Sequence, residues 1–192
     1  MKKRVKIILT ISALLLATFI CSTITAATSA ATETSLASAA KALAGKTVWV
    51  VDVNTNADYS NALLLRVVQL LPEYLPGVKV VHVTTAEKGN PFFLLKPENY
   101  PDAVIIGVGV CESTTPQVVN YAARAKEKKI PCVICYDKKL QQVKDKYVVT
   151  YRVPDVPAYE LTDSLPSTQQ ENEAEARRLT PMLVEGLLGQ LK

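Results

Sequence analysis

Cys111 follows an apolar run that would carry it to the rim of an α/β sheet. The run, Ala103–Val110, is rich in β-branched residues and has two glycines near its end, which is typical of a buried parallel strand. Ser113, Thr114, Thr115 and Pro116 come next and favour the start of a helix. Parallel sheets bind ligands at the carboxyl ends of their strands. The spacing therefore predicts a site with Cys111 as its catalytic residue, a thiol that could act as a nucleophile or a redox group.

The neighbours of Cys111 would set how reactive its thiol is. We expect Thr115 to cap the following helix and Pro116 to occupy its first turn, so free backbone amides would lie near the sulfur. These amides would lower the pKa of Cys111, whereas the carboxylate of Glu112 would raise it. The same spacing is also compatible with an inert cysteine at the end of a strand.

A second group of polar residues follows the first expected strand. That strand, Lys46–Asp52, ends in an acidic residue and is followed by a polar turn. In a flavodoxin-like strand order of 2-1-3-4-5, the first and third strands are neighbours where the order reverses, which is where such sheets bind ligands. We therefore expect a small-molecule ligand there, with substrate-binding residues Asp52, Asn54, Asn56, Ser113, Thr114 and Thr115.

Cys132 and Cys135 have the spacing of a C-x-x-C redox motif, but they lie in an expected strand. Redox pairs of this kind begin a helix. Residues three apart in a strand lie on opposite faces and about 10 Å apart, whereas a disulfide needs Cα atoms within about 7 Å. We interpret both cysteines as core residues. A bridge between Cys111 and Cys135, across neighbouring strand ends, stays open.

Other kinds of catalytic site have little support in the sequence. The single histidine, His82, lies inside an expected strand, and we interpret it as a packing or rim residue. One histidine supports neither a metal site nor a Ser-His-Asp triad. The segment Gly107-Val-Gly109 lacks the third glycine of a dinucleotide-binding loop. We therefore expect no cofactor and no metal.

The apolar pattern predicts the elements that position these residues. Strands and helices alternate, which predicts a three-layer α/β fold with a mostly parallel, five-stranded, flavodoxin-like or Rossmann-like sheet and a long C-terminal helix. A helix that begins near Tyr59 should stop near Pro72 or Pro76. We expect strands at 46–52, 78–83, 103–110, 131–136 and 147–153, helices at 59–71, 116–129, 138–144 and 171–191, and a loop at 154–169.

The N-terminus has the pattern of a secretory signal peptide. A basic segment precedes an apolar stretch of about 15 residues, which is short for a membrane span of about 20 residues, and small residues follow. We expect residues 1–30 to be the signal peptide, 31–44 a linker and 45–192 a single domain. The protein would then be periplasmic or secreted, and would touch the membrane only through an uncleaved signal.

The positive charge of the chain belongs to this signal. The formal net charge is +4, and the signal holds four basic residues and no acidic one. The rest therefore has 22 − 4 = 18 basic and 18 acidic residues. A neutral domain has no electrostatic attraction for nucleic acid or anionic lipid, so we expect no nucleic-acid partner.

From about Val48 to Leu188 the chain resembles the UGSC family, which is named for a motif that starts with selenocysteine or cysteine and ends with cysteine. The resemblance rests on three parts of the sequence. The first is the turn and helix after the first strand, and the second is the segment Asp102–Cys111 together with the next strand, which begins at Ile130-Pro131. The third is the valine-and-proline segment before the C-terminal helix. It implies that Cys111 is the motif's first residue. The closing cysteine is replaced by Thr114, so a dithiol cycle within the motif is impossible.

Two classes of function follow from these observations. The first is an exported UGSC-like protein of unknown reaction, which uses Cys111 as a nucleophilic or redox thiol on a small molecule. The second is a non-catalytic periplasmic module that binds a small ligand in the same crevice or serves as an interaction partner. Thiol reactivity of Cys111 distinguishes them.

Overall fold

The structure is a computed structural model, and it describes residues 41–53, 62–84, 97–109, 114–137, 153–162 and 166–191. The expected signal peptide at 1–30 and the expected short helix at 138–144 lie outside these residues. Within them, no helix is both long and apolar enough to cross a membrane.

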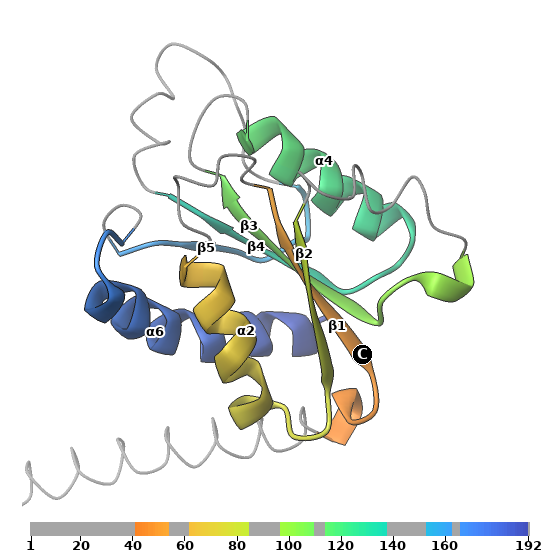
Figure 1. The fold of residues 1–192 in the computed structure, drawn as a ribbon. Helices are drawn as coiled ribbons and strands as arrows, with labels where there is room; N and C mark the ends of the chain where they lie inside the picture. The colour runs from red at the N-terminus through yellow and green to blue at the C-terminus, as the bar shows by residue number, and fades with distance from the viewer. Residues whose placement is uncertain are drawn as a thin grey trace, which may run out of the picture. The chain divides into compact units, whose positions relative to one another are not determined.

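Five parallel strands form one sheet in the order β2-β1-β3-β4-β5, the predicted flavodoxin-like order (Figure 1). Residues 103–108 of the central strand β3 are buried, which explains their continuous apolar character. The strands are β1 (Thr47–Asp52), β2 (Lys79–Thr84), β3 (Ala103–Gly109), β4 (Cys132–Tyr136) and β5 (Ala158–Glu160).

The fifth strand is not where the sequence predicted it. We expected a strand at 147–153 and a loop at 154–169, but β5 lies inside that expected loop, and residues 147–152 lie outside the described part. Hydrogen bonds from Ile134 N to Pro157 O and from Leu161 N to Tyr136 O, both 2.9 Å, extend its pairing with β4. A strand of three residues beside Pro157 has no periodic pattern, and proline fits at the start of an edge strand.

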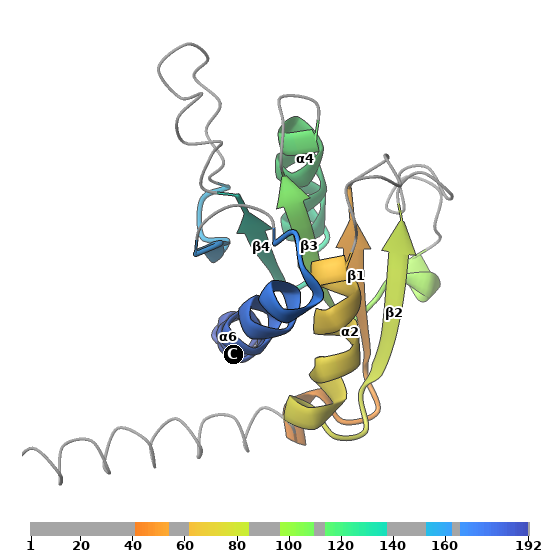
Figure 2. The same cartoon turned by 60° about the vertical axis from the view of Figure 1, so that its left-hand side comes forward.

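Helices cover both faces of the sheet, which confirms the three-layer fold. Helix α4 (Thr114–Glu127) packs on one face, and α2 (Ala62–Tyr74) and α6 (Gln169–Leu188) lie side by side on the other (Figure 2). A short 3-10 helix, η1 (Pro97–Asn99), precedes β3. The predicted long C-terminal helix is thus confirmed as α6, which continues through Pro181.

The end of α2 agrees with the prediction, and the start of α4 differs from it. Helix α2 ends at Tyr74, between the two prolines predicted to stop it, and it passes through Pro72 because a proline near the end of a helix removes only one hydrogen bond, while Leu75 N still donates to Leu71 O. Helix α4 begins at Thr114, so Thr115 is not its cap and lies with Pro116 in the first turn. Proline is tolerated there because the first N–H groups of a helix have no partner within it.

A capping box and a partly buried ion pair hold α6 in place. Thr168 caps the helix, and Glu171 accepts hydrogen bonds from Ser167 N and Thr168 N, which lower the pKa of its carboxyl group. Further along, the carboxylate of Glu175 accepts hydrogen bonds from Thr162 and Arg178. These contacts connect α6 to the chain that leaves β5.

Gly186 lets α6 approach the sheet closely. A Cβ atom at this position would lie 2.4 Å from Tyr159 Oη and 2.9 Å from Val133 Cγ1. Both distances are shorter than normal carbon contacts, so any side chain here must displace the sheet or the helix.

The substitution Gly186→Ala should therefore destabilise the protein by about 1–3 kcal/mol, because overpacking outweighs the gain in helix propensity. Urea unfolding followed by circular dichroism measures the change. Gly189→Ala is the matched control, because a Cβ there meets atoms only at 3.7–3.8 Å. Equal stability of the two variants would contradict this explanation.

Candidate functional site

Asp52 and the end of β3 meet at the carboxyl edge of the sheet. Strand β1 pairs with β3 so that Asp52 is opposite Gly107, and Val53 N donates a hydrogen bond of 3.0 Å to Gly107 O. The side chain of Asp52 is completely buried. A buried carboxylate costs free energy unless other groups compensate its charge, which makes this edge electrostatically unusual.

A β-bulge redirects β3 just before the predicted cysteine. Ile106 pairs with Ile134 and Gly109 pairs with Tyr136. Between these two pairs β3 advances by three residues, whereas β4 advances by two. The register shift lies between Ile106 and Gly109, and the peptide between Gly107 and Val108 in this stretch is cis. Bulges are frequent beside active sites, where they change the direction of a side chain or end the pairing.

A sulfur atom occupies the space beside Gly107. A Cβ atom at this position would lie 2.5 Å from Cys135 Sγ. The thiol of Cys135 therefore occupies the space above Gly107, next to Asp52 in the neighbouring strand. This contact gives a packing reason for a glycine in the Gly107-Val-Gly109 segment.

His82, which the sequence indicated as a packing or rim residue, lies at this polar edge. His82 Nε2 lies 3.8 Å from Asp52 Oδ2, and the carboxylate and the imidazole come from neighbouring strands. Thr84, directly opposite Asp52 in the register of β1 and β2, is on the same face. The alternation of His82 and Thr84 along β2 was visible in the sequence, but the register that sets them beside Asp52 was not.

The remaining predicted site residues divide between described and undescribed parts of the chain. Thr114 is buried at the first position of α4, directly after the 110–113 connection from β3. For Thr115 only the main chain is described, in the first turn of α4. Cys111, Asn54, Asn56 and Ser113 lie outside the described residues. The structure thus brings Asp52 to the end of β3 as predicted.

Cys132 and Cys135 are buried free thiols on opposite faces of β4, which confirms them as core residues. Cys132 Sγ donates to Ala122 O in α4, and Cys135 Sγ donates to Ile106 O. Burial raises the pKa of Cys132 to about 11 and that of Cys135 to about 12, with a further contribution from the charge of Asp52 on the second thiol. Neither cysteine takes part in a disulfide, so the possible bridge from Cys111 to Cys135 is not formed.

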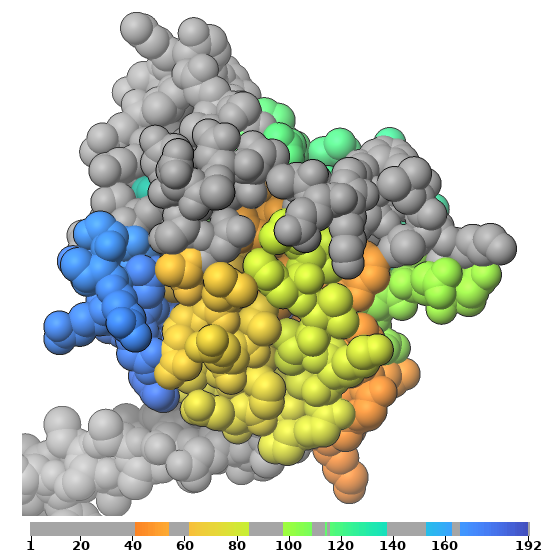
Figure 3. All heavy atoms as spheres, in the orientation of Figure 1, coloured from red at the N-terminus to blue at the C-terminus, as the bar shows by residue number. Residues whose placement is uncertain are grey.

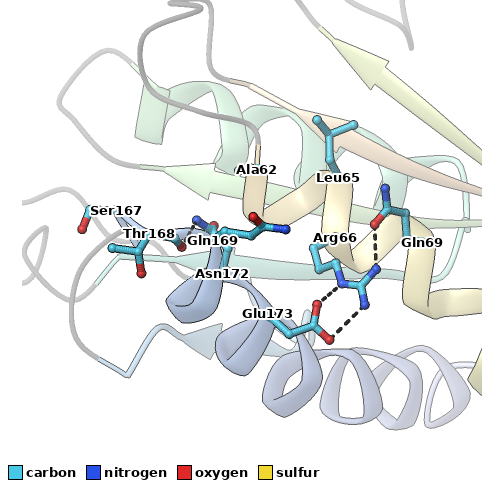
Figure 4. A pocket seen from close by; sticks show the side chains of 9 residues that line it. All are labelled: Ala62, Leu65, Arg66, Gln69, Ser167, Thr168, Gln169, Asn172 and Glu173. Carbon is cyan, nitrogen blue, oxygen red and sulfur yellow. Dashed lines mark hydrogen bonds and ion pairs between the residues drawn. The ribbon is translucent and has the colours of Figure 1, made fainter.

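A hollow of about 490 Å³ lies between α2 and α6, away from the strands (Figure 4). Its polar side chains already bind one another: Arg66 donates to Glu173 Oε1 at 2.9 Å and to Gln69 Oε1 at 2.7 Å. Figure 3 shows α2 exposed between β2 and α6 on this side of the molecule. We interpret the hollow as a gap spanned by an interhelical ion pair. Among the described residues, no cluster of His, Cys, Asp or Glu could hold a metal ion.

The sequence model of the UGSC family matches residues 22–189. The chain belongs to the UGSC family. This match includes the five described strands and helices α2, α4 and α6, so the family resemblance is confirmed. Comparison with curated proteins gives no match.

Two solved structures are similar in backbone arrangement. RosB with the bound intermediate 8-demethyl-8-formylriboflavin-5'-phosphate is 10% identical, with a TM-score of 0.45, over 76% of this chain and 79% of that chain. FerB from Paracoccus denitrificans, a flavoenzyme NAD(P)H:(acceptor) oxidoreductase, is 12% identical, with a TM-score of 0.35, over 76% of this chain and 97% of that chain. Because the identities and TM-scores are this low, the chemistry of this UGSC protein follows only from its own residues.

The two buried thiols should make stability depend on alkaline pH. Because their pKa values are raised in the folded state, their contribution is complete below the unfolded value of 9.0 and is lost as the pH rises towards 11 and 12. Between pH 8 and pH 10 the wild type should lose about 2 kcal/mol more unfolding free energy than Cys132→Ala/Cys135→Ala. Urea unfolding at the two pH values measures this difference. Equal losses would contradict the burial of the thiols.

Proposed function

We propose that this UGSC protein is exported and uses Cys111 as a reactive thiol on a small molecule bound at the carboxyl ends of β1 and β3. The observation that carries the proposal is the burial of the other thiols. Cys132 and Cys135 are buried, free and shifted to high pKa. Of the three cysteines after the expected signal peptide, Cys111 is therefore the candidate for thiol chemistry.

Chain connectivity supports the location. Cys111 is two residues after Gly109, the end of β3, and three residues before Thr114, the start of α4. Two residues span at most about 7 Å, and this connectivity supports a position of Cys111 near the edge where Asp52 is buried. The β-bulge in β3 is a further feature typical of a strand that delivers a functional side chain.

The chemistry of a single thiol is limited to steps that need no second cysteine in the motif. As a nucleophile, the Cys111 thiolate would attack one sulfur of a small disulfide, forming a mixed disulfide and releasing the other sulfur as a thiolate. Since Thr114 stands where the family motif has its closing cysteine, a second, external thiol would have to release the protein. With a carbon electrophile, the thiolate would displace a leaving group, which departs with the electron pair of the broken bond, and would form a thioether at an alkyl carbon or a thioester at an acyl carbon.

The substrate-binding roles of the predicted residues remain part of the proposal. Asp52 would bind a cationic or hydrogen-bond-donating group of the ligand. Asn54 and Asn56, which follow β1, and Ser113 and Thr115, which follow β3, would supply neutral hydrogen-bonding groups.

Selective alkylation tests the proposal. In the folded protein without its expected signal peptide, which contains Cys21, iodoacetamide at pH 8 should modify Cys111 and leave Cys132 and Cys135 unmodified, because only a thiolate that solvent can reach reacts. Peptide mass spectrometry identifies the modified residue, and Cys111→Ser should abolish the reaction. A Cys111 as inert as the two core thiols would refute the proposal.

The alternative, binding without catalysis, has a separate signature. A ligand of the same crevice would raise the thermal unfolding temperature, and this increase would survive Cys111→Ser in a binding module. The buried Asp52 at the strand ends is the feature that such a module would use.

The intact mass of the protein outside the cytoplasm tests whether it is exported and its signal peptide removed. In a Gram-negative host that carries the full-length chain, the periplasmic or secreted protein should lack its first 26–31 residues, because the basic segment and the apolar stretch are typical of a cleaved signal. Intact mass spectrometry of the periplasmic fraction and the medium measures the cleavage site. Full-length protein confined to the cytoplasm would contradict export.

A further inference from the structure

The hollow between α2 and α6 contains a buried hydrogen-bond acceptor that the interhelical ion pair does not use. Asn172 lines this hollow and is only 6% exposed. Its Oδ1 atom is buried and has no hydrogen-bond partner in the described part of the chain. Buried polar atoms in native proteins are nearly always hydrogen-bonded. The exception at Asn172 therefore points to a donor that comes from outside the chain.

The main chain fixes the orientation of the Asn172 amide group. Its Nδ2 atom donates to Thr168 O at 2.8 Å and to Pro166 O at 3.4 Å. Both partners are carbonyl oxygens, which accept hydrogen bonds and cannot donate them, so the nitrogen and not the oxygen must face them. Oδ1 is therefore turned away from these carbonyls and needs a donor, such as a hydroxyl group.

The charged side chains of the hollow compensate each other. Among its described lining residues only Arg66 and Glu173 are charged, and Arg66 donates to both carboxylate oxygens (Figure 4). This hydrogen bonding lowers the pKa of Glu173, so the pair stays ionised and has no net charge. An anionic ligand would be repelled by the carboxylate and a cationic one by the guanidinium, whereas a neutral ligand avoids both costs.

The start of α6 supplies hydrogen-bond donors to complement the acceptor. The first N–H groups of a helix have no partner within it. Thr168 Oγ1 accepts from Glu171 N, and the described contacts give no acceptor to the N–H groups of Gln169 and Gln170. Gln169 also lines the hollow. A hydroxyl group suits this surface, because it donates its proton to one partner and accepts a hydrogen bond from another.

We propose that this hollow binds a small neutral molecule with several hydroxyl groups, such as a monosaccharide, and that Asn172 selects it. The volume of about 490 Å³ is typical of small-molecule sites and much larger than a single water molecule requires. Leu65, which is 43% exposed, offers an apolar surface to the C–H groups of such a ligand. The described lining residues do not belong to the strand ends, so this inference does not rest on the proposed thiol chemistry.

Sugars that differ only in charge test the proposal on the full-length protein. At pH 6, glucose is neutral, glucosamine is cationic and glucuronate is anionic. Titrations followed by 1H–15N NMR spectra give a dissociation constant for each, and galactose, mannose and myo-inositol extend the neutral series. The signals of Gln169 and Asn172 should shift, and the best neutral compound should have a dissociation constant at least about fivefold lower than either charged sugar.

A matched pair of variants tests the role of Asn172. Asn172→Leu removes the acceptor, keeps a similar volume and continues the buried face that Ala176 and Leu179 form along α6, so circular dichroism should show a folded protein. It should raise the dissociation constant of the best neutral compound about tenfold, through the loss of one hydrogen bond. Gln170→Leu changes an exposed neighbour that is not among the described lining residues, and should leave the dissociation constant unchanged.

Three results would overturn the proposal. The first is equal affinity for the neutral and the charged sugars, a comparison that needs no variant. The second is unchanged binding in Asn172→Leu. The third is the absence of shifts at Gln169 and Asn172 with every neutral compound up to about 50 mM, which would leave water as the partner of the Asn172 acceptor.

Discussion

The parallel pairing of β1 with β3 is the constraint on which the candidate site depends. It sets Asp52 opposite Gly107, and it makes the carboxyl ends of these two strands the place where the chain order reverses. Because each strand is followed by a connection on the same edge, polar residues far apart in the sequence converge there. A different order of the same strands would leave Asp52 and the Cys111 segment at separate positions.

Close packing explains why Cys132 and Cys135 are expected to stay protonated. The sulfur of Cys135 fills the space above Gly107, and Cys132 is enclosed between β4 and α4. Burial disfavours the thiolate and so raises the pKa of both cysteines. The same contacts that complete the core thus disfavour thiol chemistry at Cys132 and Cys135.

The sequence predicted the elements with strong periodic patterns and failed where the pattern was short. Strands β1 to β4 and helix α6 were recognised because their apolar residues recur over five or more positions. Strand β5, with three residues next to Pro157, has no period to detect, and its pairing with β4 is a tertiary contact. The start of α4 was shifted by two residues because prolines and hydroxyl residues indicate a helix start only approximately.

By itself the sequence determined which residues end their strands: Asp52 and the segment towards Cys111 each follow an apolar run, which is a local pattern. Membership of the UGSC family follows from the sequence as well. Only the tertiary structure decided that His82 lies 3.8 Å from Asp52 and that Gly107 accommodates the sulfur of Cys135. The physical reason is that strand register and the bulge in β3 arise from pairing between distant segments, and no local pattern specifies them.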